Sequence, residues 1–240
     1  MHRFLLREGD VVDDKVFVII SEELRNQWTK VLRFRIGEKV ILFRDDDKEY
    51  VGEITSILPK IIQGNVLNVS ERKTELPVNI IVAQSILKNP EKLEWILQKG
   101  TELGMSDFYP LITHRTERQF LPKFERLQRI LVEATEQCGR CKVPVLHEPM
   151  KFEAFLKTKV TKDSLVLIPH TMGGKKMNEL KLIDEKSIVV CIGPEGGFDE
   201  KEVEDVTKVG GISVTLGKRV LRSETAAIAA VAMLAAHIEV

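Results

Sequence analysis

The chain has 240 residues, of which 43% are hydrophobic and 30% are charged; this composition is typical of a folded globular protein and argues against a disordered one. Its 36 basic residues balance its 36 acidic residues, so any nucleic-acid partner must be held by a local basic patch and not by the overall charge. The apolar stretches are too short or too interrupted to span a membrane, and the start, MHRFLLREGD, lacks the apolar core of a signal peptide, which predicts a cytoplasmic protein.

Residues 1–72 are predicted to form a small β-rich domain, either a barrel or a sandwich. Apolar and β-branched residues alternate or run together in three segments, KVFVII, KVILFR and EYVGEITSIL. The polar turn RDDDKE separates the second segment from the third and predicts a hairpin. The polar stretch SERKTELPV, which contains Pro77, marks the predicted domain boundary.

From residue 73 to residue 240, strands and helices are predicted to alternate. The predicted strands are VNIIVAQSI, DFYPLI, SLVLIP, SIVVCI and ISVTL, and the main helices are PEKLEWILQKGTEL, KFERLQRILVEATEQC and SETAAIAAVAMLAAHI. This alternation indicates an α/β domain whose parallel sheet is covered by helices. The last helix is apolar around most of its circumference, so it must be buried by its own domain, by a partner subunit, or by both.

Cys138 and Cys141 have the spacing of a redox pair or of half a zinc site. A zinc site needs two further ligands at short spacing, and no second pair of this kind occurs in the sequence. A redox role is disfavoured because the pair ends a predicted helix, where the helix dipole opposes a thiolate. We therefore predict reduced thiols and no metal site.

Two loops that each connect a buried strand with a helix carry the candidate site. The first, GPEGGF at 193–198, precedes Asp199 and Glu202, whose spacing predicts a capping box at a helix start. The second, LGKRVLR at 216–222, leads into a helix with Ser223 as the candidate N-cap. Both loops follow predicted parallel strands, and open α/β sheets bind ligands at the carboxyl ends of such strands.

A dinucleotide or a nucleoside triphosphate is poorly supported as the ligand, because neither glycine-rich fingerprint of those sites occurs in the chain. Lying side by side, the loops would offer glycines for close backbone approach, two arginines and two carboxylates. The alternative is purely structural. In that case the first loop is a tight turn, Arg219 and Arg222 are solvated, and Glu224 only complements the helix dipole.

The two loop sequences resemble a known family. IGPEGGF followed by LGKRVLRSETAAIAA is similar to the C-terminal motifs of the SPOUT methyltransferases, and specifically of the RsmE family, which methylates N3 of a uridine in the 16S RNA of the small ribosomal subunit. MHRFL, VLRFRIGEKV, QKGTELG and EATEQCGR match that family in order, so the resemblance covers nearly the whole chain. Three features depart from it: Gln27 stands where many members carry a histidine, RDDD stands where a D-G turn is common, and Cys141 is an incidental addition.

The resemblance implies a PUA-like RNA-binding β-barrel, residues 1–72, followed by a SPOUT α/β trefoil-knot domain with a mainly parallel sheet, residues 73–240. It also implies that the knot binds S-adenosyl-L-methionine, that two subunits pair through the knot as a homodimer, and that the partner is 16S ribosomal RNA within the small ribosomal subunit. Such a knot is an exception to the rule against threaded connections. Carried onto this sequence, the implied cofactor contacts fall on Ile168, Pro169, Ile192, Gly193, Gly196, Gly197, Leu216, Gly217, Leu221, Ser223, Thr225 and Ala226.

The candidate catalytic residues follow from the chemistry of the implied reaction. N3 of uridine carries a proton and is a poor nucleophile until that proton leaves, so either a carboxylate accepts the proton or a cation stabilises the developing anion. Glu195 and Glu224 are candidates for the first role, and Arg222 is the candidate for the second. We favour Arg222 as the electrostatic group, with positioning supplying much of the remaining catalysis.

Basic residues gather in two parts of the chain. Residues 115–142 hold seven Lys or Arg against four Asp or Glu, and the segment RNQWTKVLRFR interleaves basic with aromatic residues. Phosphate contacts and stacking aromatics hold single-stranded RNA, although the same aromatics could be barrel core and the arginines a solvated face. The residues predicted to contact RNA are Arg3, Arg25, Trp28, Lys30, Arg33 and Arg140.

Two other functions remain open at the level of sequence. One is a knotted methyltransferase that acts on the ribose 2′-hydroxyl of a transfer RNA; the PUA-like start and EQCGR count against it. The other is a non-catalytic RNA-binding assembly factor, which would tolerate loss of the cofactor loops; the intact GPEGG and RVLRSETA segments count against it.

Overall fold

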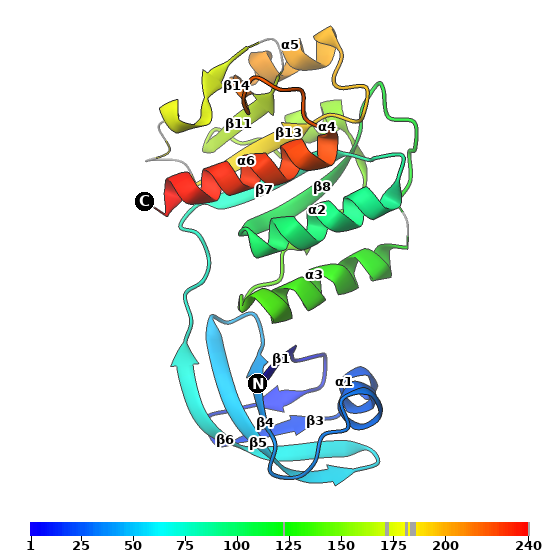
Figure 1. The fold of residues 1–240 in the computed structure, drawn as a ribbon, viewed down its shortest axis with the longest axis vertical. Helices are drawn as coiled ribbons and strands as arrows, with labels where there is room; N and C mark the ends of the chain where they lie inside the picture. The colour runs from blue at the N-terminus through cyan, green and yellow to red at the C-terminus, as the bar shows by residue number, and fades with distance from the viewer. Residues whose placement is uncertain (122, 171–172, 181, 183–185, 240) are drawn as a thin grey trace. The chain divides into compact units, whose positions relative to one another are not determined.

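The computed structural model describes residues 1–121, 123–170, 173–180, 182 and 186–239. The chain forms two compact units (Figure 1). The first contains Met1–Glu75 together with Thr135–Val143, and the second contains Leu76–Ala134 together with Pro144–Val240. The sequence pattern predicts one boundary near residue 72 and does not predict that residues 135–143 group with the first unit.

The first unit is built on a curled sheet with the strand order β1-β4-β5-β6-β3-β2 (Figure 1). The neighbours are antiparallel except for the parallel β1–β4 pair, and β4 and β5 form the hairpin predicted at RDDDKE. Its elements are β1 (His2–Leu5), β2 (Val11–Val12), β3 (Val16–Ile19), α1 (Glu22–Asn26), a π-helical turn (Gln27–Val31), β4 (Lys39–Phe43), β5 (Lys48–Leu58) and β6 (Ile61–Glu71).

Bulges and glycines allow this sheet to close over its core. The β5–β6 register shifts between Val51 and Gly52 and again after Ile54, and such bulges bend a strand and increase its twist. A Cβ atom at Gly64 would lie 2.2 Å from the Phe17 ring, and one at Gly52 would lie 2.5 Å from it. Glycine at both positions therefore admits the fully buried Phe17 ring into the core.

Trp28 belongs to the same core. Its ring centroid lies 5.0 Å from that of Phe4, 5.7 Å from that of Phe34 and 6.1 Å from that of Phe17. The side chain is fully buried, so no face of the indole is open to a base. The prediction that Trp28 contacts RNA is therefore wrong, because aromatic packing inside the half-barrel uses the whole ring.

The second unit carries a parallel sheet, which among the described residues has the order β10-β8-β7-β13-β11-β14-β12, with β9 beside β8. This agrees with the α/β prediction. Its elements are β7 (Asn79–Ser85), α2 (Pro90–Glu102), β8 (Met105–Ile112), α3 (Phe124–Cys138, which ends in the first unit), β9 (Val145–Leu146), β10 (Met150–Lys151), α4 (Phe152–Thr158), β11 (Ser164–Pro169), β12 (Lys175–Lys176), a 3-10 turn (Met177–Glu179), β13 (Ser187–Ile192), α5 (Glu200–Lys208), β14 (Ile212–Thr215) and α6 (Ser223–Ile238).

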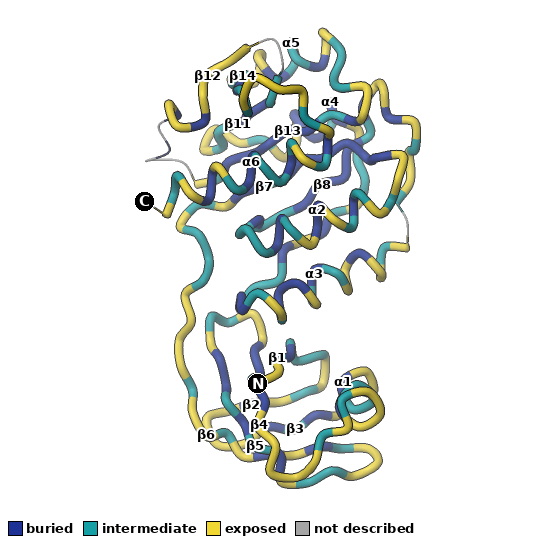
Figure 2. The backbone as a smooth tube through the Cα atoms, in the orientation of Figure 1, coloured by how far each residue is buried: buried dark blue, intermediate teal, exposed yellow. Residues whose placement is uncertain are grey.

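Helices cover this sheet, and its central strands are buried along their length (Figure 2). On β13, Val189 and Cys191 belong to a core cluster that also contains Phe155 of α4 and Val206 of α5. Side chains alternate along a strand, so the buried Val190 between them faces the other side, where α6 contacts both β13 and β7. Burial on both faces explains why residues 188–192, IVVCI, form an uninterrupted apolar run.

The last helix, α6, is partly buried by its own domain. Its buried residues include Ala227, Ala230, Val231 and Leu234, and it contacts α2 as well as the sheet. Met233 remains 39% exposed. The small alanine side chains let α6 lie close to its neighbours, which accounts for an apolar sequence with no clear polar face.

The cysteines are unpaired thiols. Cys138 ends α3, as predicted, and burial raises the pKa of Cys141 and raises that of Cys191 to about 12. Within the described residues, no group of three or more His, Cys, Asp or Glu side chains is placed to hold a metal ion. In the same residues, no helix is both long enough and apolar enough to cross a membrane.

Candidate active site

A cavity of about 670 Å³ lies in the second unit, at the carboxyl ends of β11, β13 and β14 and at the start of α6. This volume falls within the range of small-molecule sites, roughly 300–1,000 Å³. The two loops predicted from sequence, 193–198 and 216–222, form most of its wall. The predicted cofactor contacts that line the cavity are Pro169, Ile192, Gly193, Gly196, Gly197, Leu216, Gly217, Leu221, Ser223 and Ala226.

Two predicted cofactor contacts do not line the cavity. Ile168 is buried, and its side chain belongs to the core cluster under α4 and α5. Thr225 is exposed on the first turn of α6. Each is directly adjacent in sequence to a lining residue. Successive side chains of a strand or a helix point in different directions, so the side chains of these two residues point away from the cavity.

A buried hydrogen-bonded cluster joins the two loops. The Ser223 hydroxyl donates to the Gly193 carbonyl oxygen over 2.6 Å. The fully buried Gln84, at the end of β7, donates from Nε2 to Ser223 Oγ over 3.0 Å, to the Ser85 carbonyl over 2.8 Å and, at a longer 3.4 Å, to the Gly193 carbonyl. Ser223 was predicted to cap α6; instead it is the first helical residue, and its hydroxyl connects the loops.

Glycines shape the inner surface of the first loop. Gly197 has a φ of +69°, a conformation that residues with a side chain rarely adopt. A Cβ atom at Gly193 would lie 3.0 Å from the backbone nitrogen of Phe198, so a side chain there would disturb the turn itself. A Cβ atom at Gly196 would meet only the Arg115 side chain, at 3.4 Å, which leaves Gly196 as the position where a side chain can enlarge the wall without breaking the loop.

A third segment, after β8, supports the first loop. The predicted capping box at the start of α5 is present: Asp199 accepts from the Glu202 N–H at 2.8 Å, and Glu202 accepts from the Asp199 N–H at 2.9 Å. Glu202 also accepts from the backbone N–H of His114 at 2.8 Å, and Arg115 donates to the Gly196 carbonyl at 2.7 Å. These bonds hold the first loop in place from the segment that follows β8.

All three candidate catalytic residues line the cavity. Arg222 is exposed and has no ion-pair partner among the described residues, so its guanidinium is available to a ligand. Glu195 is exposed, and its carboxylate accepts from the backbone N–H of Lys88 at 3.3 Å. Glu224 is mostly buried; one carboxylate oxygen lies 3.3 Å from Lys92 Nζ, and the other is buried with no described partner.

The cavity also contains residues that the sequence did not assign to this role. Pro194 and Phe198 lie within the first loop, and Arg219 and Val220 lie within the second. Their position in the two predicted loops would have been enough to predict them as lining residues. Lys92 and Arg115 come from segments after β7 and β8, and only the sheet order brings them to the site. The added lining residues are Lys92, Arg115, His170, Pro194, Phe198, Arg219 and Val220.

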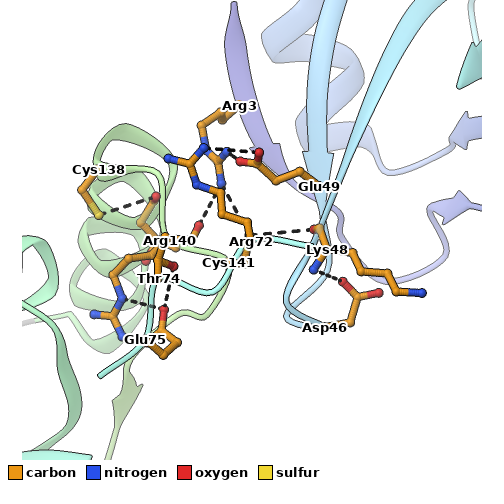
Figure 3. A network of polar contacts seen from close by, with 11 residues as sticks. Arg3, Asp46, Lys48, Glu49, Arg72, Thr74, Glu75, Cys138, Arg140 and Cys141 are labelled. Atoms are coloured by element: carbon orange, nitrogen blue, oxygen red, sulfur yellow. Dashed lines mark hydrogen bonds and ion pairs between the residues drawn. The ribbon is translucent and has the colours of Figure 1, made fainter. Parts of the chain in front are cut away.

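Two predicted RNA contacts, Arg3 and Arg140, belong to an ionic network of the first unit (Figure 3). Arg140 pairs with Glu75 and is buried, and its carbonyl accepts from Arg3 Nη2 at 3.0 Å. Arg3 pairs with Glu49, which also lies 3.4 Å from Arg72 Nη1. The guanidinium groups of Arg3 and Arg140 are occupied by the carboxylates of Glu49 and Glu75, which argues against the prediction that these two arginines contact RNA.

The remaining predicted RNA contacts differ in availability. Arg25 donates to the backbone carbonyls of Ile20 and Pro59, which occupies its guanidinium. Lys30 and Arg33 are exposed, and Arg33 has a φ of +56°, which is uncommon for a residue with a side chain.

Comparisons with known proteins connect this geometry with a family. A family model described as an RNA methyltransferase domain matches residues 74–235, and one described as an RNA methyltransferase PUA domain matches residues 29–67. The ribosomal RNA small subunit methyltransferase E of Bacillus subtilis is 30% identical over 98% of this chain and 95% of its own, and that of Buchnera aphidicola from Acyrthosiphon pisum is 31% identical over 94% and 90%.

Two solved structures are also similar. The methyltransferase E of Neisseria gonorrhoeae, bound to S-adenosyl methionine, has a TM-score of 0.87 at 30% identity and covers 97% of this chain and 95% of that one. A putative methyltransferase of Legionella pneumophila, in complex with the same cofactor, has a TM-score of 0.85 at 32% identity and covers 98% and 96%. The predicted fold, a PUA-like domain followed by a SPOUT domain, is confirmed, and the strand order is consistent with a trefoil knot. The chain belongs to the ribosomal RNA small subunit methyltransferase E family.

Proposed function

We propose that this protein transfers the methyl group of S-adenosyl-L-methionine to N3 of a uridine in the 16S RNA of the small ribosomal subunit. The observation that carries the proposal is the cavity between the two loops, in a chain whose similar structures from Neisseria and Legionella hold that cofactor. The uracil N3 specificity extends beyond the names of the relatives and rests on the chemistry of the lining residues.

The lining of the cavity fits this cofactor. Gly196 and Gly217 leave the backbone open to close approach, and apolar side chains such as Ile192 and Leu221 offer surfaces for a flat ring. The buried Glu224 oxygen that has no partner among the described residues needs a hydrogen-bond donor, and an α-ammonium group supplies one. When bound, the cofactor supplies an electrophilic methyl group on a sulfonium.

The positions of the three candidate residues suggest different roles. The Glu224 carboxylate already lies 3.3 Å from Lys92 Nζ, and its second oxygen is buried with no partner among the described residues, which suits Glu224 to binding a donor group of the cofactor more than to accepting a proton. Arg222 has no ion pair within the described part of the chain and lies at the cavity, where its planar guanidinium can stabilise negative charge on the uracil carbonyl oxygens. Glu195 is exposed and carries no ion pair among the described side chains, so it is the better candidate for the proton acceptor.

Exposed basic residues of the first unit supply a contact surface for RNA. Lys30, at the end of the π-helical turn, and Arg33 and Arg35, just after it, are exposed. Phe34 lies between the two arginines and packs against Phe4 and Trp28, which holds the segment on the barrel. Cationic side chains on a fixed backbone fit phosphate groups.

Nucleoside analysis tests the proposed function. The purified protein is incubated with labelled cofactor and small subunits from a strain that lacks the endogenous enzyme, and the RNA is then digested and analysed by mass spectrometry. We expect N3-methyluridine as the labelled product. A 2′-O-methylated nucleoside would favour the transfer-RNA type of knotted enzyme instead, and cofactor binding without any methylated nucleoside would favour an assembly factor.

We also propose that two copies pair through the knotted domain. Met233 and Ala236, which remain exposed on the apolar helix α6, support this pairing because they leave apolar surface for a partner subunit to cover. Light scattering of the purified protein should give the mass of a dimer; a monomer that binds the cofactor at full strength contradicts this arrangement.

A further inference from the structure

An arginine lies over an exposed aromatic ring a few residues after Arg115, which lines the cavity. Phe120, in the segment that follows β8, is 65% exposed. The guanidinium carbon of Arg118 lies 4.6 Å from the centre of its ring. A water-exposed phenylalanine beneath a guanidinium offers one flat apolar surface and one cationic surface, both of which suit a nucleic-acid base.

The start of this segment is fixed relative to the cavity. Thr113 and Thr116 form a hydrogen-bonded turn, in which the Thr113 N–H donates to Thr116 Oγ1 at 2.9 Å. His114 is bonded to α5 through Glu202, and Arg115 both lines the cavity and donates to Gly196. Arg118 and Phe120 therefore follow a rigid anchor within a few residues and cannot lie far from the cavity mouth.

Arg118 has an unmet requirement for an acceptor. Its Nε is buried and has no hydrogen-bond partner among the described residues. The nearby carboxylate on the chain, Glu117, lies 2.9 Å from Lys88 Nζ, which already compensates its charge. Since Arg118 forms no ion pair with any carboxylate that the structure describes, the terminal nitrogens of its guanidinium can donate charge-assisted hydrogen bonds to a phosphate oxygen.

We propose that Arg118 and Phe120 form a platform for the RNA strand beside the methylated nucleotide, with Phe120 stacking on a base and Arg118 contacting a phosphate. The inference rests on the proposed function. A base whose N3 is methylated must leave its stacked position to reach the cavity, so its neighbour in the strand loses a stacking partner. An exposed ring a few residues from the cavity wall can replace that partner, which lowers the free energy of the extended strand.

Binding measurements on matched variants test the platform. Phe120→Ala removes the ring, Phe120→Trp keeps a stacking surface, and Trp95→Ala is the control because Trp95 is also exposed (52%) and lies near a cation, Lys99 at 5.1 Å, on helix α2. Small subunits lacking the modification serve as the ligand. We expect Phe120→Ala to weaken binding about 5- to 150-fold, corresponding to one stacked base, whereas Phe120→Trp and Trp95→Ala bind like the wild type.

The salt dependence separates the two residues. Replacing Arg118 with Ala should reduce the slope of log affinity against log salt by about 0.7, the value for one phosphate of a single strand, and Phe120→Ala should leave the slope unchanged. Affinity for S-adenosylmethionine and turnover at saturating subunits should stay near wild type in both variants, because neither residue lines the cavity.

Two outcomes would overturn the platform. One is an equal loss of affinity for small ribosomal subunits in Phe120→Ala and Trp95→Ala. The other is dissociation of the protein dimer in Phe120→Ala, which would assign the ring to a contact between copies of this protein. Failure of the proposed function is distinguishable: a wild-type protein that makes no N3-methyluridine but loses RNA affinity on Phe120→Ala would refute the reaction and support the platform.

Discussion

The cluster of Gln84, Ser223 and Gly193 should couple the stability of the domain to its affinity for S-adenosylmethionine. Ser223→Ala removes the 2.6 Å donor of the Gly193 carbonyl and deprives Gln84 of an acceptor in a buried place. Leaving such groups incompletely satisfied costs about 1–3 kcal/mol of unfolding free energy. Because the bond joins the two loops around the cavity, we expect cofactor affinity to fall as well. If the whole of this 1–3 kcal/mol were lost from binding, the fall would be about 5- to 150-fold, which is the upper limit.

A double-mutant cycle with a control tests this coupling. Gln84→Leu, Ser223→Ala and the double variant are compared by urea denaturation and by calorimetric titration with the cofactor. Since both single variants break one shared cluster, the double variant should lose at least about 1 kcal/mol less than the sum of the two. Ser106→Ala, which removes a 3.1 Å bond to the Ile80 carbonyl elsewhere in the same unit, should lower stability without changing cofactor affinity. Additive effects, or equal affinity losses in Ser223→Ala and Ser106→Ala, would refute the reasoning.

Three further predictions concern the cavity and the core. Arg222→Ala should lower single-turnover methylation about 10²- to 10³-fold with little change in cofactor affinity, and Arg222→Lys should recover only part of the rate, because a point charge does not reproduce a planar fork; parallel loss of binding and rate would instead make Arg222 a cofactor contact. Gly196→Val should abolish cofactor binding in calorimetry while the melting temperature stays near wild type, since the added Cβ meets only the Arg115 side chain; unchanged affinity would place the cofactor elsewhere. Burial raises the pKa of Cys191 to about 12, so this thiol should resist alkylation at pH 8 until the protein is unfolded, and rapid labelling of the native protein would contradict its burial.

The strands, the main helices and both loops could be predicted because each depends on residues close together in the sequence. IVVCI, residues 188–192, is apolar throughout since β13 is buried on both faces, and the Asp199–Glu202 spacing alone encodes a capping box. The order of the strands could not be predicted in this way. Lys92 and Arg115 reach the cavity only because β7 and β8 lie beyond β13 in the sheet, and no local pattern contains that information.

Mixed basic and aromatic segments were less informative than the loops, because the same composition serves a core and a surface. Trp28 fills the half-barrel, whereas Lys30 and Arg33, a few residues later, are exposed. The EQCGR segment gives the clearest case: Arg140 matches the family pattern, yet here its guanidinium neutralises Glu75 and its carbonyl binds Arg3. Removing one partner of a buried ion pair leaves an uncompensated charge and destabilises the fold. The pair between Arg140 and Glu75 therefore gives Arg140 a structural role in the first unit, to which residues 135–143 belong. Resemblance to a family motif therefore identifies a residue that the fold needs, and only its exposure in the structure decides whether RNA can reach it.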